Sequence, residues 1–182
     1  MRNIRNPRWL VAVAYGAAIA TASGCGSAQA VQSPATAAHV SNQDRRWIEQ
    51  DHTANMAETD TGKLATMDGA TPAVRSVGSV LDRDHTASDA ALIKLAGRLK
   101  IALATSETVR QTEAYGRLAD ESGRLFDYDF IGTMLAAHQS MISATRWEIS
   151  HGSSPDVISL ARQTLPALLK HLKLLQAAAP KG

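Results

Sequence analysis

Residues 126–151 read FDYDFIGTMLAAHQSMISATRWEISH, and their pattern indicates how the chain folds. Its apolar residues recur every three or four positions, which is the period of one face of an α-helix. His138 lies at the centre of that stripe. The other members of the stripe are Ile131, Met134, Leu135, Met141, Ile142, Thr145 and Ile149. We therefore expect a long helix whose apolar face carries a histidine into the interior.

The rest of the chain contains three more long helical patterns and one short one. The long patterns cover about residues 43–68, 72–102 and 155–180, and the short one covers 108–119. No alternating β-pattern of useful length occurs, and the three Trp, three Tyr and two Phe are too few to form the core alone. We expect an all-α fold, a four-helix bundle with a short extra helix in the crossover.

Signals for helix ends divide the long helices into two hairpins. Asp68 and Gly69 end the first helix, and Thr71 as N-cap with Pro72 at the first helical position begins the second. Residues 152–155 read GSSP and separate the last two helices in the same way. Short connections make each pair antiparallel.

The first 24 residues predict a secretory signal peptide. Three arginines precede an apolar run from Trp9 to Ala22, and small residues follow. That run is shorter than the roughly 20 residues of a membrane-spanning helix, so a retained anchor is the weaker interpretation. Residues 25–42 lack an apolar period and predict a flexible tether, which leaves the bundle to residues 43–179.

Two cleavage sites compete. Ala22-Ser23-Gly24-Cys25 is similar to the motif at which a bacterial lipoprotein is cut before an acylated cysteine, whereas Ala28-Gln29-Ala30 suits ordinary secretion. Cys25 is the only cysteine, so it has no disulfide partner in an oxidising compartment. We expect lipid attachment at Cys25 and a periplasmic or outer-membrane location, with cleavage after Ala30 as the alternative.

The charge balance excludes nucleic acid as a partner. The whole chain carries a formal charge of +2, but three of its 19 basic residues and none of its 17 acidic residues lie in the expected signal peptide. The mature chain therefore has no basic surplus, and we expect no nucleic-acid binding. Protein partners cannot be named from the sequence.

Four histidines are spaced so that each hairpin carries one pair. His52 and His85 are 33 residues apart, and so are His138 and His171. The midpoints fall in Asp68-Gly69 and between Ser154 and Pro155, so each pair is expected to lie level, about 25 Å from its turn at 1.5 Å per residue. The two DHTA copies at 51–54 and 84–87 supply His52 and His85.

The helical faces distinguish these histidines. Asp84 and His85 fill the gap between the apolar residues of the second helix, and His171 lies on the flank of the last helix. His52 lies nearly opposite the apolar face of the first helix, so we expect it to be solvated. Glu58 lies on that face, but at about 9 Å below the level of His85.

Histidines and carboxylates inside a bundle can form a metal site or a buried hydrogen-bonded network. The candidate ligands are His85, His138, His171, Asp84 and Glu58, and imidazole with carboxylate suits Fe, Zn or Cu. The Glu-x-x-His pattern of di-iron sites is absent, since Leu135 and Leu168 stand three residues before His138 and His171. No nucleophile motif or phosphate loop occurs, so no catalytic residue is assigned.

Five motifs recur in this order and spacing in a known family. They are ETDTGKLA (58–65), PAV (72–74), LDRDH (81–85), FDYDF (126–130) followed by His138, and TLPAL (164–168) followed by His171. With them the chain resembles, over about residues 46–178, the bacterial domain of unknown function 4142 family of exported proteins, often labelled predicted outer membrane proteins. The resemblance implies a ferritin-like bundle in the cell envelope and brings no established activity. Family members usually carry Asp where this chain has Ala137, and His52 has no counterpart.

Two functions follow as hypotheses. The first is a lipid-anchored envelope module that binds a partner or responds to stress without catalysis. The second is a metal-binding protein that uses the histidines of the bundle core.

Overall fold

The computed structural model describes residues 39–180, and these form five α-helices. The helices are α1 (Asn42–Asp68), α2 (Pro72–Leu99), α3 (Val109–Ala119), α4 (Gly123–His151) and α5 (Pro155–Ala178). The described residues contain no strand, so the all-α prediction is confirmed. The expected signal peptide, the cleavage sites, Cys25 and most of the tether lie outside the described residues.

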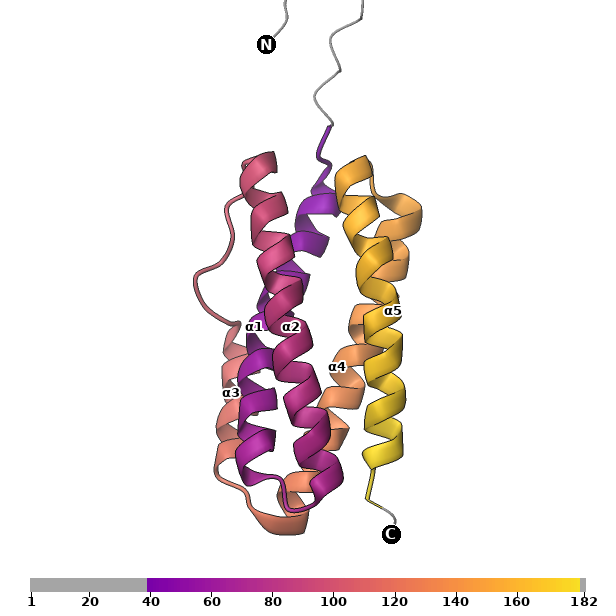
Figure 1. Ribbon diagram of the computed structural model, residues 1–182. Helices are drawn as coiled ribbons and strands as arrows, with labels where there is room; N and C mark the ends of the chain where they lie inside the picture. Colours follow the sequence, from indigo (N-terminus) through magenta and orange to yellow (C-terminus); the bar gives the residue numbers. More distant parts are fainter. Residues whose placement is uncertain (1–38, 181–182) are drawn as a thin grey trace, which may run out of the picture. The chain divides into compact units, whose positions relative to one another are not determined.

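Two antiparallel hairpins form the bundle. Helices α1 and α2 pack along each other, as do α4 and α5, and the hairpins meet where α1 contacts α4 and α2 contacts α5 (Figure 1). Helix α3 lies outside the four, against α1 and α4, within the crossover that returns the chain from the end of α2 to the start of α4. None of the helices from 39 to 180 combines the length and hydropathy needed to cross a membrane.

Most helix ends lie within a few residues of their predicted positions. Thr71 caps α2 as expected, with its side chain accepting a hydrogen bond from the backbone N–H of Val74. Helix α2 ends at Leu99 rather than near 102, because Lys100 adopts a left-handed conformation with φ of 55°. Gly123, with φ of 64°, begins α4 three residues before the predicted start.

Each hairpin turn is held by a carboxylate from the other hairpin. Asp127 of α4 accepts hydrogen bonds from the backbone N–H groups of Ala70 and Thr71 at 2.8 and 3.0 Å. Asp44 of α1 accepts from the N–H groups of Ser153 and Ser154 at 3.0 and 3.1 Å. These groups would otherwise be unsatisfied at helix starts, so the two aspartates fix how the hairpins dock.

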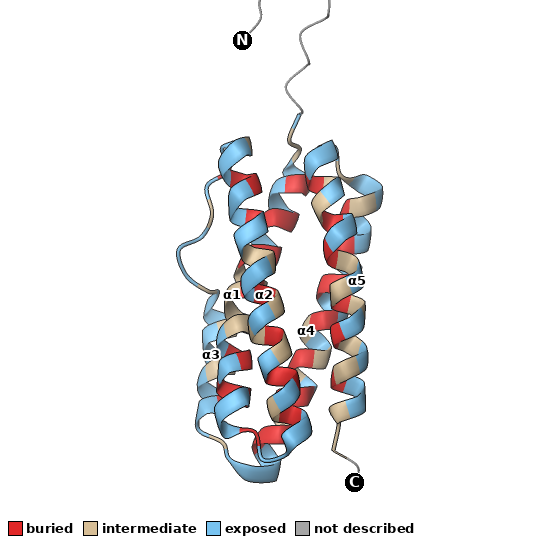
Figure 2. Ribbon diagram, in the orientation of Figure 1, coloured by how far each residue is buried: buried red, intermediate tan, exposed pale blue. Residues whose placement is uncertain are grey.

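The apolar core has two large clusters with a polar layer between them, and a smaller third cluster of Met141, Ile142 and Leu168. One cluster contains Leu64, Val77, Leu81, Phe126 and Leu175, and the other contains Trp47, Ile48, Leu92, Leu95 and Val157. Buried residues line the facing sides of the helices along their length (Figure 2). The polar layer lies where the apolar stripes of all four long helices are interrupted.

Helices α1 and α2 approach closely through two glycines. A Cβ atom at Gly62 would lie 2.8 Å from the carbonyl oxygen of Gly78, and one at Gly78 would lie 2.7 Å from the carbonyl oxygen of Gly62. Real side chains do not approach a backbone this closely, so both positions need glycine. The contact brings the α1 backbone near enough for its short polar side chains to reach the polar layer.

Candidate functional site

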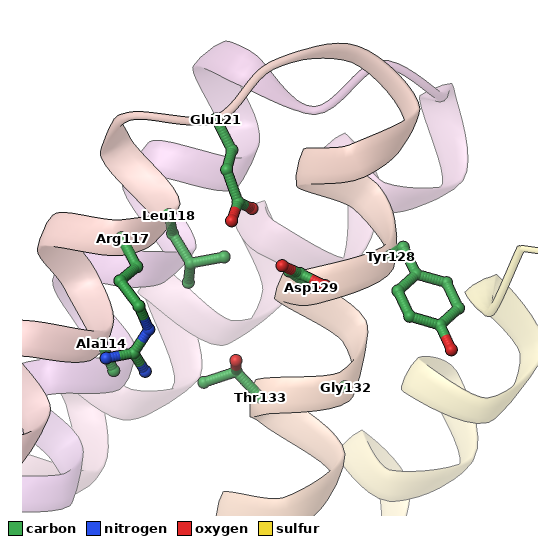
Figure 3. Close-up of a pocket in the computed structure, with 8 residues that line it drawn as sticks. All are labelled: Ala114, Arg117, Leu118, Glu121, Tyr128, Asp129, Gly132 and Thr133. Carbon is green, nitrogen blue, oxygen red and sulfur yellow. The ribbon is translucent and has the colours of Figure 1, made fainter.

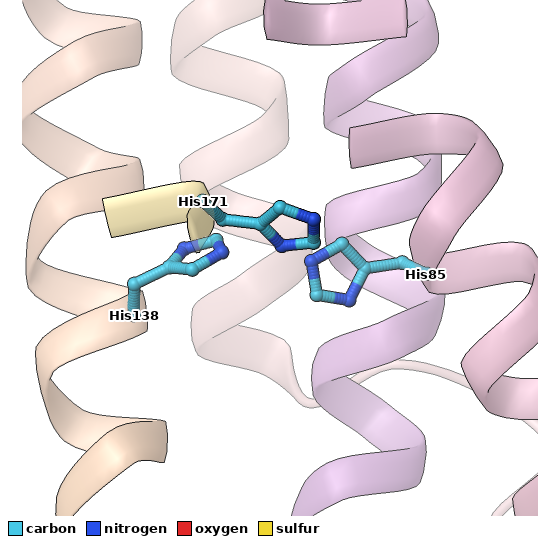
Figure 4. A group of neighbouring side chains, drawn as sticks. All are labelled: His85, His138 and His171. Carbon is cyan, nitrogen blue, oxygen red and sulfur yellow. The ribbon is translucent and has the colours of Figure 1, made fainter. Parts of the chain in front are cut away.

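Three buried histidines from three helices form the centre of the polar layer. His85 of α2, His138 of α4 and His171 of α5 are each at most 4% exposed. Their rings point toward one another (Figure 4), with ring centroids 5.1 to 5.5 Å apart. One ligand nitrogen from each histidine lies within 4.8 Å of the other two.

The second ring nitrogen of each histidine is engaged by the surrounding protein. His138 Nδ1 lies 3.0 Å from the carbonyl oxygen of Met134, and His85 Nδ1 lies 2.8 Å from Oδ1 of Asn55. His171 Nε2 lies 3.0 Å from Oδ2 of Asp84. Each partner is an oxygen acceptor, so each of these nitrogens donates a proton. In a neutral ring, the opposite nitrogen is then a free lone pair.

Those opposite nitrogens are buried without a hydrogen-bond partner among the described residues. The unpartnered atoms are Nε2 of His85, Nε2 of His138, Nδ1 of His171 and both carboxylate oxygens of Glu58. An unsatisfied buried polar atom costs about 1–3 kcal/mol. Nε2 of His85 and Oε2 of Glu58 lie 2.9 Å apart and compensate each other by charge, so a coordinated cation would remove the cost at the other three atoms.

Glu58 of α1 supplies the carboxylate of this layer. Its Oε2 lies 2.9 Å from Nε2 of His85 and 3.4 Å from Nδ1 of His138, and the side chain is 3% exposed. The first distance is short, but the atoms are not aligned for a hydrogen bond, so both also count as unpartnered. Glu58 can therefore serve in two ways. It can form an ion pair with His85, or it can coordinate a cation together with the histidines.

The surrounding charges set different protonation states in the triad. Burial lowers the pKa of a histidine, but the nearby Glu58 carboxylate outweighs it and raises the pKa of His85. Burial prevails elsewhere: the pKa of His138 is lowered, and that of His171 is lowered to about 4. Burial would raise the pKa of Glu58, but the charges of His85 and His138 lower it to about 2. These shifts favour a protonated His85 beside a charged Glu58 carboxylate.

The three histidines would bind a metal ion if their ligand nitrogens moved closer together. Metal–nitrogen bonds of about 2.0–2.1 Å in a tetrahedral site place the ligand nitrogens roughly 3.4 Å from one another. The three nitrogens lie within 4.8 Å, so rotation of the imidazole rings has to close the remaining distance. The three imidazole nitrogens suit Zn, Cu or Fe, and the Glu58 carboxylate beside His85 would supply a fourth donor.

The structure brings together all five residues named from the sequence, but not in the expected way. Asp84 lies at the edge of the layer: its side chain is 22% exposed and contacts the outer nitrogen of His171. His171 was expected on the flank of its helix and is 1% exposed. The 9 Å offset between Glu58 and His85 was wrong, because the two side chains are in contact.

His52 was expected to be solvated, and this was wrong. It is 5% exposed, with Nδ1 2.6 Å from Asp89 Oδ1 and Nε2 3.0 Å from the carbonyl oxygen of Ala104. It thus links α1 to α2 and to the crossover. The prediction failed because the side of α1 opposite its apolar stripe faces α2 and the crossover rather than solvent. The register of the hairpin differs as well: Asn55 faces His85 and His52 faces Asp89, which places the centre of the hairpin at residues 70–71 rather than at 68.5.

Two polar residues of α1 were missed. Asp51 and Asn55 are each 2% exposed, and the Asn55 amide nitrogen donates to Asp51 at 3.4 Å while its oxygen contacts His85. Burial raises the pKa of Asp51 to about 7. Together with Glu58 they occupy positions 51, 55 and 58, the spacing of one helical face, and that spacing was the available signal. A helical face without apolar residues is expected to lie toward solvent, so the burial of Asp51 and Asn55 was not predicted.

A separate surface pocket lies between α3 and α4. Glu121 and Asp129 point into it while Tyr128 turns away (Figure 3). Burial and the hydrogen bond with Asp129 raise the pKa of Glu121. None of the residues lining this pocket belongs to the histidine layer.

Comparison with known proteins identifies the family. The chain belongs to the family described as Domain of unknown function (DUF4142), whose profile matches residues 29–178. A search of curated proteins found no match. Among solved structures, the fold is similar to the crystal structure of a DUF305 fragment from Deinococcus radiodurans, with a TM-score of 0.67 and 13% identity over 76% of this chain and 95% of that chain. At that identity the likeness shows the fold alone.

Proposed function

We propose that this DUF4142 domain binds one transition-metal ion through His85, His138, His171 and Glu58. The observation that carries the proposal is the orientation of the three imidazoles. Each directs one nitrogen to a protein acceptor and leaves the other buried and unpartnered in the same layer. Metal-ligating histidines show this arrangement, because an acceptor on the far nitrogen fixes the tautomer and orients the ring.

The rival is a closed hydrogen-bonded core in which the His85–Glu58 pair is the only charged element. It leaves the free nitrogens of His138 and His171 without a function and without a partner. Buried polar groups in native proteins are nearly always satisfied, and the metal hypothesis satisfies them.

The test uses the full chain, purified without an affinity tag or chelator. Bound metal is measured by mass spectrometry, and the melting temperature is followed with added Zn²⁺, Cu²⁺ or Fe²⁺. At a free metal concentration 100 times the Kd, stabilisation is about 2.7 kcal/mol. We expect near-stoichiometric metal and a higher melting temperature in the wild type, and neither in His138→Gln.

His52→Gln is the matched control, because His52 is buried to a similar degree but lies outside the triad. It should keep the metal-dependent shift even if its own melting temperature is lower. A wild type that is free of metal and gains no stability from any of the three ions would leave the histidines as core architecture.

The location and attachment of the protein are separate proposals. A signal peptide with lipid attachment at Cys25, placing the domain in the periplasm or at the outer membrane, is supported by the sequence of residues 1–30. Loss of membrane association in Cys25→Ala would support it, and unchanged association would contradict it. The ferritin-like relationship is also a proposal, supported by the single crossover that contains α3. A non-catalytic role in the envelope is compatible with a metal held in the core.

A further inference from the structure

Among the described residues that form a hydrogen bond or ion pair with the triad, only Asp84 is partly exposed. Glu58, Asn55 and Met134 are 2%, 2% and 4% exposed, whereas the side chain of Asp84 is 22% exposed. Asp84 belongs to α2, but its Oδ2 contacts His171 of α5. The seam between α2 and α5 is therefore where the buried layer communicates with solvent.

Both oxygens of Asp84 are engaged by surface cations. Arg83 donates from two nitrogens to Oδ1 at 2.8 and 2.7 Å. Lys170 lies 3.3 Å from Oδ2, the same oxygen that accepts from His171. The side chains of Arg83 and Lys170 are 65% and 57% exposed, so both can leave Asp84 at little cost.

We propose that Asp84 is the access point of the metal site. A hydrated divalent cation displaces the Lys170 ammonium from Oδ2 and is held there by the carboxylate. It then passes to the triad as the His171 ring turns away from Asp84. After transfer the Asp84–His171 hydrogen bond forms again and Lys170 returns. This inference rests on the proposed function, since it describes how the same site is filled.

The incoming cation and the Lys170 ammonium compete for Oδ2 of Asp84, so the proposal predicts how substitutions change the rate of metal uptake. Asp84 attracts the cation, so removing its charge should slow uptake. Lys170 competes for the same oxygen, so removing its charge should accelerate uptake. A residue that only positions His171 would change how tightly the metal is held, and hence its dissociation, without changing how fast it arrives.

The experiment follows Co²⁺ binding to the full chain in a stopped-flow absorbance measurement, with dissociation measured by transfer to excess chelator. Asp84→Asn keeps an oxygen that accepts from His171 but removes the charge. We expect its association rate constant to fall about 10-fold, with a weaker dependence on salt than in the wild type. Lys170→Met should raise the association rate constant, and as a surface change it tests the same point without risk to the core.

Asp82→Asn and Lys173→Met are the matched controls, because they make the same charge changes on the same two helices. Among the described residues, neither side chain forms a hydrogen bond or ion pair with Asp84 or with the triad. Both substitutions should leave the association rate constant unchanged. If Asp84→Asn lowers the metal affinity only by faster dissociation, the access role is overturned and Asp84 is a positioning residue. Failure of the wild type to bind Co²⁺, Zn²⁺, Cu²⁺ or Fe²⁺ at equilibrium, by contrast, would overturn the proposed function and this inference with it.

Discussion

Oε2 of Glu58 and Nε2 of His85 lie 2.9 Å apart in the centre of the bundle, and neither side chain is more than 5% exposed. The pair joins α1 to α2 by charge in the layer where both helices lack apolar residues. Burying two charges is favourable only when each compensates the other. The hairpin thus depends on a residue pair that also forms half of the candidate metal site.

Glu58→Gln should destabilise the metal-free protein most at mildly acidic pH. The pKa of Glu58 is lowered from 4.5 to about 2, so its stabilisation is present above pH 4.5 and is lost as the pH falls toward 2. The pKa of His85 is raised, so its stabilisation is complete below pH 6.5 and is lost as the pH rises through the raised value. The pair is therefore strongest between these limits.

The expected loss near pH 5.5 is about 3 kcal/mol or more, the usual result of breaking a buried pair. At a pH above the raised pKa of His85 it should be smaller, because His85 gives up its proton. Urea unfolding with chelator at both values measures it, and the exposed Glu49→Gln is the control on the same helix. An equal loss at both values would mean that the pair is not ionised.

Gly62→Ala should destabilise the bundle by forcing α1 away from α2. Its Cβ would lie 2.8 Å from the backbone nitrogen of Asp82 and from the oxygen of Gly78. Overpacking of this kind costs about 1–3 kcal/mol, measurable as a shift of the urea midpoint. Gly132→Ala is the control, since a Cβ there meets nothing within 4 Å. It should be neutral or stabilise the protein by about 0.5–1 kcal/mol, as Ala is the better helix former.

Asp127→Asn should loosen the turn between α1 and α2. The variant retains one acceptor oxygen for the N–H groups of Ala70 and Thr71 but loses the charge and the second acceptor. The expected loss is about 1–3 kcal/mol, with faster hydrogen exchange at both amides. Asp129→Asn, two residues along α4, removes a charge that faces Glu121 and should not destabilise the protein. Equal effects of the two substitutions would mean that Asp127 does not hold the turn.

Glu148 should make stability fall as the pH rises from 4.5 to about 7. Burial, and the hydrogen bond to Asp44, raise its pKa to about 7. Its Oε1 has no donor among the described residues, so the carboxyl is satisfied only when it carries a proton to donate. The folded state then binds more protons than the unfolded state in this interval, and stability decreases with pH.

Glu148→Gln provides the comparison, because its amide imitates the protonated acid. Its melting temperature should fall less than that of the wild type across the same interval. Parallel pH profiles for the two proteins would contradict the raised pKa of Glu148.

The helices and their ends followed from the sequence because their signals are local. The apolar period on α4 placed His138 in the core, where it is fully buried, and Thr71 capped α2 as its position indicated. The level of His138 and His171 was also predictable, because the α4–α5 turn is short and its centre was located correctly. The α1–α2 turn was misplaced by about two residues, which put Glu58 at the wrong level. His52 was expected in solvent because its partners lie on α2 and in the crossover rather than on its own helix.

The sequence by itself determined the helices, the two hairpins, and the three histidines and two carboxylates of the candidate site. The packing of the helices places some of these residues at the centre of the polar layer and others at its edge, and the sequence alone does not show which. The tertiary structure placed Glu58 beside His85, moved Asp84 to the rim, and buried His52, Asp51 and Asn55. A polar side chain is expected to be exposed unless its hydrogen-bond partner is known, and here the partners belong to other helices. Burial of polar residues depends on contacts between helices, whereas burial of apolar residues can be predicted from the apolar period of each single helix.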